Sequence, residues 1–381
     1  MADKKYSALK IAAAYVGTVV GAGFASGQEV LQFFAYFGLQ GLLGLALATV
    51  LFIVLGYAVL LMGHSLQARS HLPVIRHAGG PLVGKLVDGI TTFFLFGALA
   101  VMAAGAGAIF REEYHLPALL GSSILIAVTL ATVLLGIGQV INAISFVAPA
   151  LLATVLGVSL FAIFTNPSSV LANLAWSDVP RAAAPFWPLA ALLYASYNLV
   201  LSVAVLAPLG SLSRKENLLP GAALGGTGLG LGAGAITLAL LATAPDVIAW
   251  EVPMLQIAGV LAPVARTLYS VILLAEIYTT AVSSLYGFTA RLAESDSNRF
   301  SYLAVIASAV ALIAAQSGFS RLVAFLFPLV GYGGLLLVGG LAYHFIRKKA
   351  GGRVPAFFLR GLIPAARKTF PSKKRDEGDP Q

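Results

Sequence analysis

The chain has 381 residues, of which 59% are apolar and only 10% charged, and its mean hydropathy is +0.91. This composition excludes a soluble globular domain and predicts an all-α polytopic membrane protein. The absence of cysteine excludes disulfides and thiolate metal sites.

Ten apolar stretches are long enough to cross a bilayer, since a spanning helix needs about 20 such residues. The expected spans are 8–37, 39–65, 82–110, 117–136, 139–164, 185–208, 220–243, 262–290, 300–316 and 319–346. Because the number of spans is even, both termini are expected on the same side of the membrane.

The first span, 8–37, is interrupted by glycine. Gly21, Gly23 and Gly27 fall within seven residues, and Glu29 follows at membrane depth. Glycine costs a helix interior about 1 kcal/mol relative to alanine, so three of them make unwinding cheap. An unwound backbone at this depth must line a protein cavity, as in the broken helices of secondary transporters. The alternative is close helix packing through small residues.

Two long connections, 165–184 and 244–261, are expected on the outer side of the membrane. Their tryptophans, Trp176 and Trp250, read as interfacial anchors. The second connection is also well placed to act as a lid.

Basic residues are concentrated on one side of the predicted spans. With the amino terminus in the cytoplasm, twenty of the 24 Lys and Arg are cytoplasmic, three are outside and Arg266 lies near an outer boundary. By the positive-inside rule, both termini are expected in the cytoplasm, with the protein in the cell membrane. The net charge of +9 therefore does not indicate nucleic-acid binding, and the basic tail 347–381 is expected in solvent or against lipid.

The chain contains a faint internal duplication. Residues 144–149 (Ile-Ser-Phe-Val-Ala-Pro) resemble residues 323–328 (Val-Ala-Phe-Leu-Phe-Pro), and both lie in the last span of a group of five. The same offset carries the first span onto a polar cluster in the sixth. Five spans repeated as five more must have inverted topology, and the first and sixth helices are then expected to be broken around a substrate site. The predicted parts are an N-terminal tail (1–7), two repeats (8–164 and 185–346) and a basic tail (347–381).

Two carboxylates, Glu29 and Glu276, lie well inside apolar spans. A charge there costs several kcal/mol, so a functional role is the default interpretation. By helical periodicity Glu276 shares one face with Thr280, Ser283 and Ser284. This set of oxygens suits a small hard cation or the polar groups of a ligand. Alternatively, the hydroxyls bond only to their own helix backbone.

Two short motifs resemble those of LeuT-type sodium symporters. Residues 17–24, Gly-Thr-Val-Val-Gly-Ala-Gly-Phe, resemble their first-helix break, and residues 280–284, Thr-Ala-Val-Ser-Ser, resemble their eighth-helix sodium motif. The string Gly-Ala-Gly-Phe-Ala-Ser-Gly-Gln-Glu at 21–29 resembles an uncharacterised amino-acid permease branch of the amino acid–polyamine–organocation superfamily. The resemblance covers 8–346 and implies a LeuT-like inverted repeat of five plus five helices.

The resemblance also implies a coupling ion. Its sodium site would use the carbonyls of Gly17, Val20 and Thr280 with the hydroxyls of Ser283 and Ser284. Phe24 stands where the symporters have the asparagine of a second sodium site, which puts a second ion in doubt. Residues 139–164 lack the lysine that fills the sodium position in some proton-coupled relatives, which favours sodium.

We therefore expect a secondary active transporter rather than an enzyme, importing a small amino acid or related amine with sodium, with no other cofactor. Its partners would be the small-molecule substrate and the lipid bilayer. The expected substrate-binding residues are Gly21, Ala22, Gly23, Phe24, Ser26, Glu29, Tyr197, Asn198, Ser202 and Glu276, with Gly97, Ala100 and Ala104 of the third span shaping the floor. The alternatives are proton-coupled transport of an organic cation or polyamine, and a channel or sensor on the same scaffold.

Overall fold

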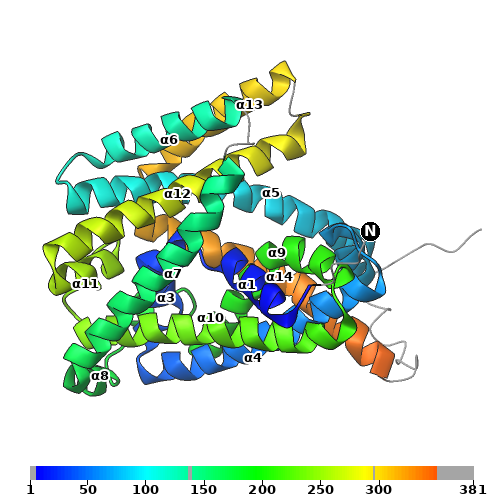
Figure 1. Ribbon diagram of the computed structural model, residues 1–381, viewed down its shortest axis with the longest axis horizontal. Helices are drawn as coiled ribbons and strands as arrows, with labels where there is room; N and C mark the ends of the chain where they lie inside the picture. The colour runs from blue at the N-terminus through cyan, green and yellow to red at the C-terminus, as the bar shows by residue number, and fades with distance from the viewer. Residues whose placement is uncertain (1–5, 136–139, 295–296, 350–381) are drawn as a thin grey trace, which may run out of the picture. The chain divides into compact units, whose positions relative to one another are not determined.

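The computed structural model describes residues 6–135, 140–294 and 297–349 (Figure 1), and their regular structure is helical apart from one isolated bridge between Tyr6 and Ser213. The chain forms two units, 1–341 and 342–381, and the described part of the second is the end of the last helix. Within the described residues, eight helices are long and apolar enough to span a membrane, and a bent pair would make nine. The chain is therefore an all-α multi-pass membrane protein.

Nine of the ten expected spans correspond to long helices. These are α4 (Leu39–Ser65), α5 (His71–Glu113), α6 (Ala118–Leu135), α7 (Val140–Thr165), α9 (Trp187–Ser211), α10 (Lys215–Thr243), α12 (Pro263–Leu292), α13 (Asn298–Ala315) and α14 (Phe319–Lys349). The connections 165–184 and 244–261 contain α8 (Pro167–Asn173), which meets α7 at 87°, the 3-10 helix η3 (Val179–Arg181) and α11 (Pro253–Leu261).

The first span is broken at the predicted glycines into α1 (Ala8–Val19), α2 (Ala22–Ser26), α3 (Gln28–Phe33) and the 3-10 helix η1 (Ala35–Phe37). Val20 and Gly21 are extended between α1 and α2. Gly27 separates α2 from α3 with φ +81°, a left-handed conformation that favours glycine. At each break the terminal carbonyl and N–H groups lose their intrahelical partners, so they become available to a ligand or a neighbour.

The expected break in the sixth span is absent, because α9 runs as one helix from Trp187 to Ser211. Its polar side chains bond to carbonyls of the same helix: Asn198 Nδ2 donates to Tyr194 O at 3.0 Å. Ser202 Oγ donates to Leu199 O at 3.4 Å. A polar cluster is thus accommodated without unwinding, and this part of α9 has no glycine to make unwinding cheap.

The helix that contains the third predicted span begins before that span. α5 consists of two helical segments that meet at Gly80, whose φ is +81°. Pro81 follows and has no N–H to donate to the preceding turn. The predicted span from residue 82 is therefore the second of the two segments.

The long helices pack in two groups, with the broken helix between them. In one group α4 packs on α9 and α10, and in the other α5 and α6 pack on α12 and α13. Figure 1 shows α4 beside α10 and α6 beside α13. The first half of the broken helix, α1, packs on α9 and α10, whereas α2 contacts α12. The backbone of the break is therefore placed where both groups can reach it.

The connection 244–261 is held to neighbouring helices by two carboxylates. Glu112, near the end of α5, accepts from the backbone N–H groups of Glu251 at 2.7 Å and Val252 at 3.3 Å. Glu251 in turn accepts from Phe319 N, at the start of α14, at 3.2 Å. The buried Met254 of α11 lies against Gly27 of the broken helix. This connection therefore covers the junction between α2 and α3 at Gly27.

Several predictions fall outside the described residues. These are the tails 1–5 and 350–381 and the side chains of residues 144–148 in the predicted duplication. The boundaries of the two five-helix repeats stay a prediction.

Candidate functional site

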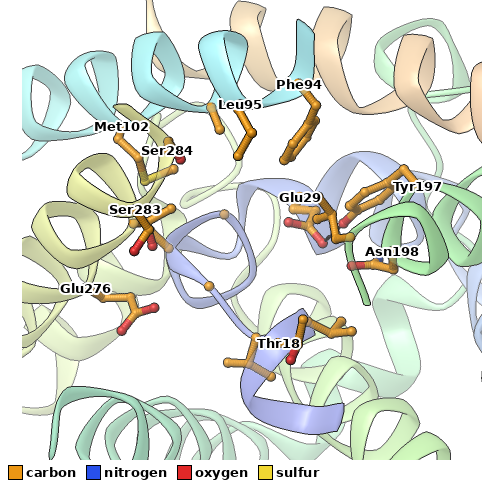
Figure 2. A pocket seen from close by; sticks show the side chains of 18 of the residues that line it. Thr18, Glu29, Phe94, Leu95, Met102, Tyr197, Asn198, Glu276, Ser283 and Ser284 are labelled. Atoms are coloured by element: carbon orange, nitrogen blue, oxygen red, sulfur yellow. Dashed lines mark hydrogen bonds between the residues drawn. The ribbon is translucent and has the colours of Figure 1, made fainter. Parts of the chain in front are cut away.

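A cavity of about 500 Å³ lies at the break between α1 and α2, a size that suits a small molecule. Seven helices (α1, α2, α3, α5, α9, α12 and α14) and the break between α1 and α2 contribute to its wall, part of which is seen in Figure 2. The lining residues are 17–23, Glu29 of α3, Phe94, Leu95, Ala98 and Met102 of α5, Tyr197, Asn198, Leu201, Ala204 and Val205 of α9, Glu276, Thr279, Thr280, Ser283 and Ser284 of α12, and Phe327 of α14.

One wall of the cavity is built around the carboxylate of Glu29. The Tyr197 hydroxyl donates a hydrogen bond to Glu29 Oε1. The other oxygen lies against the backbone of Gly23, where a Cβ would be only 2.7 Å from Oε2. The glycine of the break therefore makes the room that the carboxylate occupies.

Aromatic rings and an amide continue this wall. The Phe327 ring centroid lies 5.1 Å from that of Tyr197 and 5.9 Å from that of Phe94. Next to Tyr197, Asn198 uses its Nδ2 on the Tyr194 carbonyl, while its Oδ1 has no hydrogen-bond partner among the described residues. The wall thus combines ring faces with hydrogen-bond acceptors.

The opposite wall is the polar face of α12. Figure 2 shows Glu276, Ser283 and Ser284 on this side and Glu29 with Tyr197 on the other, with the broken helix between them. Ser283 Oγ donates to Thr279 O at 2.8 Å and Thr279 Oγ1 donates to Glu276 O at 3.0 Å. Each hydroxyl uses its hydrogen on the helix backbone but keeps oxygen lone pairs that can accept or ligate.

Local hydrogen bonds fix the broken helix at the cavity. Ser26 Oγ donates to Gly23 O at 2.8 Å and accepts from Gln28 N at 3.2 Å, so it joins α2 to α3. The Tyr269 hydroxyl of α12 donates to Ala25 O at 2.5 Å. Carbonyls that the break releases from helical bonding are therefore partly satisfied by side chains.

The structure brings most of the predicted site residues to this one cavity. All five residues of the expected sodium site line it, namely Gly17, Val20, Thr280, Ser283 and Ser284. So do seven of the expected substrate residues, namely Gly21, Ala22, Gly23, Glu29, Tyr197, Asn198 and Glu276. Their roles in binding stay predictions.

Three expected substrate residues lie outside the cavity lining. The Phe24 ring faces α10, where a Cβ on Gly232 would lie 3.2 Å from it. Ser26 is buried and holds the junction between α2 and α3. Ser202 is buried and bonds to its own helix. In each case the side chain is directed away from the cavity lining.

The sequence interpretation missed the apolar part of the lining. In the third span, Gly97 packs against Leu326 rather than the cavity, and the floor is made by larger side chains such as Phe94 and Met102. Phe327 lies in the segment that resembles 144–149, and that likeness was its only signal in the sequence. Apolar residues in an apolar span carry no mark that separates cavity lining from helix packing.

The exposed part of the lining lies at one end of the cavity. Gly17, Ala204 and Ser283 are exposed; Gly17 lies in the last turn of α1, before the break, and Ala204 and Ser283 lie in the second halves of α9 and α12. On the other side, residues 22–38 of the broken helix are all buried, beneath the connections 165–184 and 244–261. The cavity is therefore open at one end and covered at the other.

No family model matches the chain. It is 31% identical over 348 residues to the uncharacterized membrane protein YkvI of Bacillus subtilis (strain 168), a match that covers 90% of this chain and 97% of that protein. It is 30% identical over 339 residues to the uncharacterized protein YyaD of the same organism, covering 87% and 96%.

Solved transporter structures share the fold at low sequence identity. MhsT in complex with L-phenylalanine matches with a TM-score of 0.58 and 18% identity, covering 88% of this chain and 89% of that one. Inward-facing Mhp1 matches with 0.59 and 15%, covering 91% and 78%. A Na⁺-coupled sialic acid symporter in a substrate-bound outward-open state matches with 0.61 and 11%, covering 89% and 79%. These likenesses show the LeuT-like fold that the sequence motifs predict.

Proposed function

Because the chain belongs to the family of the Bacillus subtilis membrane protein YkvI and has a LeuT-like fold, we propose that it is a secondary active transporter of the cell membrane. It imports a small amino acid or related amine together with one sodium ion by alternating access. Both termini face the cytoplasm, as the distribution of Lys and Arg predicts. The structures that share the fold include transporters whose bound solutes are L-phenylalanine and sialic acid.

The observation that carries the proposal is that the end of α1 and the polar face of α12 line the same cavity. Gly17 and Val20 lie where carbonyls lose their helical partners, and Ser283 and Ser284 add hydroxyl oxygens. Unwound carbonyls and hydroxyls are the ligands by which broken-helix transporters hold sodium. An ion bound to both helices would favour the conformation in which they are close, which couples its gradient to the movement of the two helix groups.

A second candidate is proton-coupled transport of an organic cation or polyamine. It is favoured by Glu29 and Glu276, two buried carboxylates that line one cavity. Intramembrane carboxylates of this kind serve as proton relays or counter-ions. In that case transport follows the pH gradient, ignores sodium and is lost in Glu276→Gln.

The proposal is tested with purified protein in proteoliposomes, loaded with potassium and diluted into sodium or potassium buffer. Solutes for uptake are first chosen by a thermal-shift screen of amino acids and amines, because a bound ligand raises the melting temperature as its concentration passes the dissociation constant. Sodium coupling predicts accumulation only in the sodium buffer. It also predicts that the double variant Ser283→Ala, Ser284→Ala loses the sodium dependence.

The matched control is Ser308→Ala, which removes a buried hydroxyl from α13, away from the cavity lining. It should transport as the wild type does. Sodium-dependent uptake that persists in the double variant would overturn the sodium assignment.

A further inference from the structure

The charged side chains that line the cavity indicate which class of solute it can bind. Two carboxylates, Glu29 and Glu276, line it from opposite walls, and the described residues that line it include no Lys, Arg or His. A buried negative group without a cationic side chain nearby is costly unless it takes up a proton or a positive ligand compensates it. The cavity is therefore electrostatically matched to a cation and mismatched to an anion.

The hydrogen-bond pattern around Glu29 points to the same kind of ligand. Tyr197 donates its only hydroxyl hydrogen to Glu29 Oε1, and Asn198 donates to the Tyr194 carbonyl. The acceptors left for a ligand on this wall are the lone pairs of the Glu29 carboxylate and Asn198 Oδ1, which is buried without a partner among the described residues. The orientation of the Asn198 amide follows from this contact, because the Tyr194 carbonyl can only accept and must therefore face Nδ2 rather than Oδ1. A primary ammonium group, with three donors and no acceptor, is complementary to this set.

The aromatic side chains supply the third feature. Phe94, Tyr197 and Phe327 line the cavity. The ring centroid of Phe327 lies 5.1 Å from that of Tyr197 and 5.9 Å from that of Phe94. Aromatic faces attract ammonium groups, most strongly where water is excluded. Figure 2 shows Phe94 above Glu29 and Tyr197, with Asn198 below them. The negative charge of Glu29, the acceptor oxygen of Asn198 and the aromatic rings therefore lie on the same wall of the cavity.

We propose that the solute is an organic amine whose ammonium group is bound by Glu29 and Asn198 against the rings of Tyr197 and Phe327, and that a carboxylate on the solute is not required. This inference rests on the proposed function, because it assigns the substrate class of the same cavity.

The test uses three probes of one carbon skeleton: leucine, its decarboxylated counterpart 3-methylbutylamine, and its deaminated counterpart 4-methylpentanoate. Binding to purified protein in sodium buffer is measured by thermal shift and by calorimetric titration. The expected result is that 3-methylbutylamine binds at least as tightly as leucine and that 4-methylpentanoate does not bind. Failure of the amine to bind, or binding of the acid, would overturn the inference.

Two variants locate the ammonium group. Glu29→Gln should weaken amine binding about tenfold or more, because a hydrogen bond to a charged group is replaced by a neutral one. Asn198→Leu should weaken it as well by removing the acceptor. Stabilisation by sodium alone shows that each variant is folded. Amine affinity that is unchanged in Glu29→Gln contradicts the assignment.

The same proteoliposomes separate this inference from the proposed function. Sodium-driven uptake of leucine with no binding of the amine would refute the amine class and keep the transporter. Glu29-dependent binding of the amine without accumulation of any probe would refute the transporter and keep the amine site.

Discussion

The carboxylate of Glu29 lies against the backbone of Gly23, so the position of the carboxylate depends on the absence of a side chain at the second residue of α2. Tyr197 holds the other oxygen from α9. A glycine that the sequence marks as a helix breaker therefore has a second role, which is to admit a carboxylate at membrane depth. This role becomes visible only when the neighbours of residue 23 are known.

We expect Gly23→Ala to disturb both stability and ligand binding. The new Cβ would lie 2.7 Å from Glu29 Oε2, so the carboxylate that Tyr197 holds must shift. Overpacking of this kind costs about 1–3 kcal/mol. The melting temperature of purified protein should fall, and its rise on adding an amine should shrink.

Gly89→Ala is the matched control, because a Cβ on Gly89 of α5 has nothing within 4 Å. Its melting temperature should not fall. An unchanged response to the amine in Gly23→Ala would show that Glu29 does not depend on the space at Gly23.

At the scale of elements, the connection 244–261 is joined to the helices by side chains that accept from its backbone. Glu112 of α5 holds the N–H groups of residues 251 and 252, and Glu251 holds the first N–H of α14. The neighbouring Glu113 makes a different contact, a 2.5 Å ion pair with Arg266 of α12. Two adjacent carboxylates therefore hold two different elements, and one of these elements covers the broken helix.

We expect Glu112→Gln to loosen the connection 244–261. The amide keeps one acceptor oxygen, so one of two backbone N–H groups loses its partner, at a cost of about 1–3 kcal/mol where it is buried. Hydrogen exchange of peptides that cover residues 249–254 should become faster, because local opening then costs less free energy. Glu113→Gln removes the same charge without touching this backbone and should leave that exchange unchanged. Equal exchange in the two variants would contradict the role of Glu112.

At the scale of the whole molecule, the cavity is open toward the last turn of α1 and the second halves of α9 and α12 and is covered by residues 22–38 on the other side. The positive-inside rule assigns the open end to the cytoplasm, since the connections there carry Arg214, Lys215, Arg291 and Arg299. On that assignment the cavity faces inward in this conformation. The proposed transport cycle also requires an outward-open form, in which the connection 244–261 would have to move.

The absence of native cysteine allows this orientation to be tested with single introduced cysteines. Ala204→Cys, in the exposed lining, should react with a membrane-impermeant maleimide in inside-out vesicles and not in right-side-out vesicles. Trp250→Cys, in the connection 244–261 and 44% exposed in this conformation, should show the opposite pattern, because the positive-inside rule assigns that connection to the outer side. Labelling of both from the same side would contradict the assigned direction of opening.

The sequence by itself determined the fold class, the positions of the spans and the place of the first break. Apolar stretches of bilayer length leave few alternatives to helices, and glycines at 21, 23 and 27 lower the cost of unwinding at one point. It also singled out Glu29, Glu276, Ser283 and Ser284, because polar groups stand out in an apolar span. The structure brings these four residues, which come from helices distant in the chain, to one cavity.

Only the tertiary structure decided which way each side chain faces and which apolar residues complete the cavity. Phe24 and Ser26 are at the break but point into packing and the α2–α3 junction, and α9 keeps its helix despite the polarity that predicted a break. Phe94 and Phe327 line the cavity without any local signal. The physical reason is that polarity and backbone cost act locally and can be read along the chain. The partner that a side chain meets depends on the packing of helices that are remote in sequence.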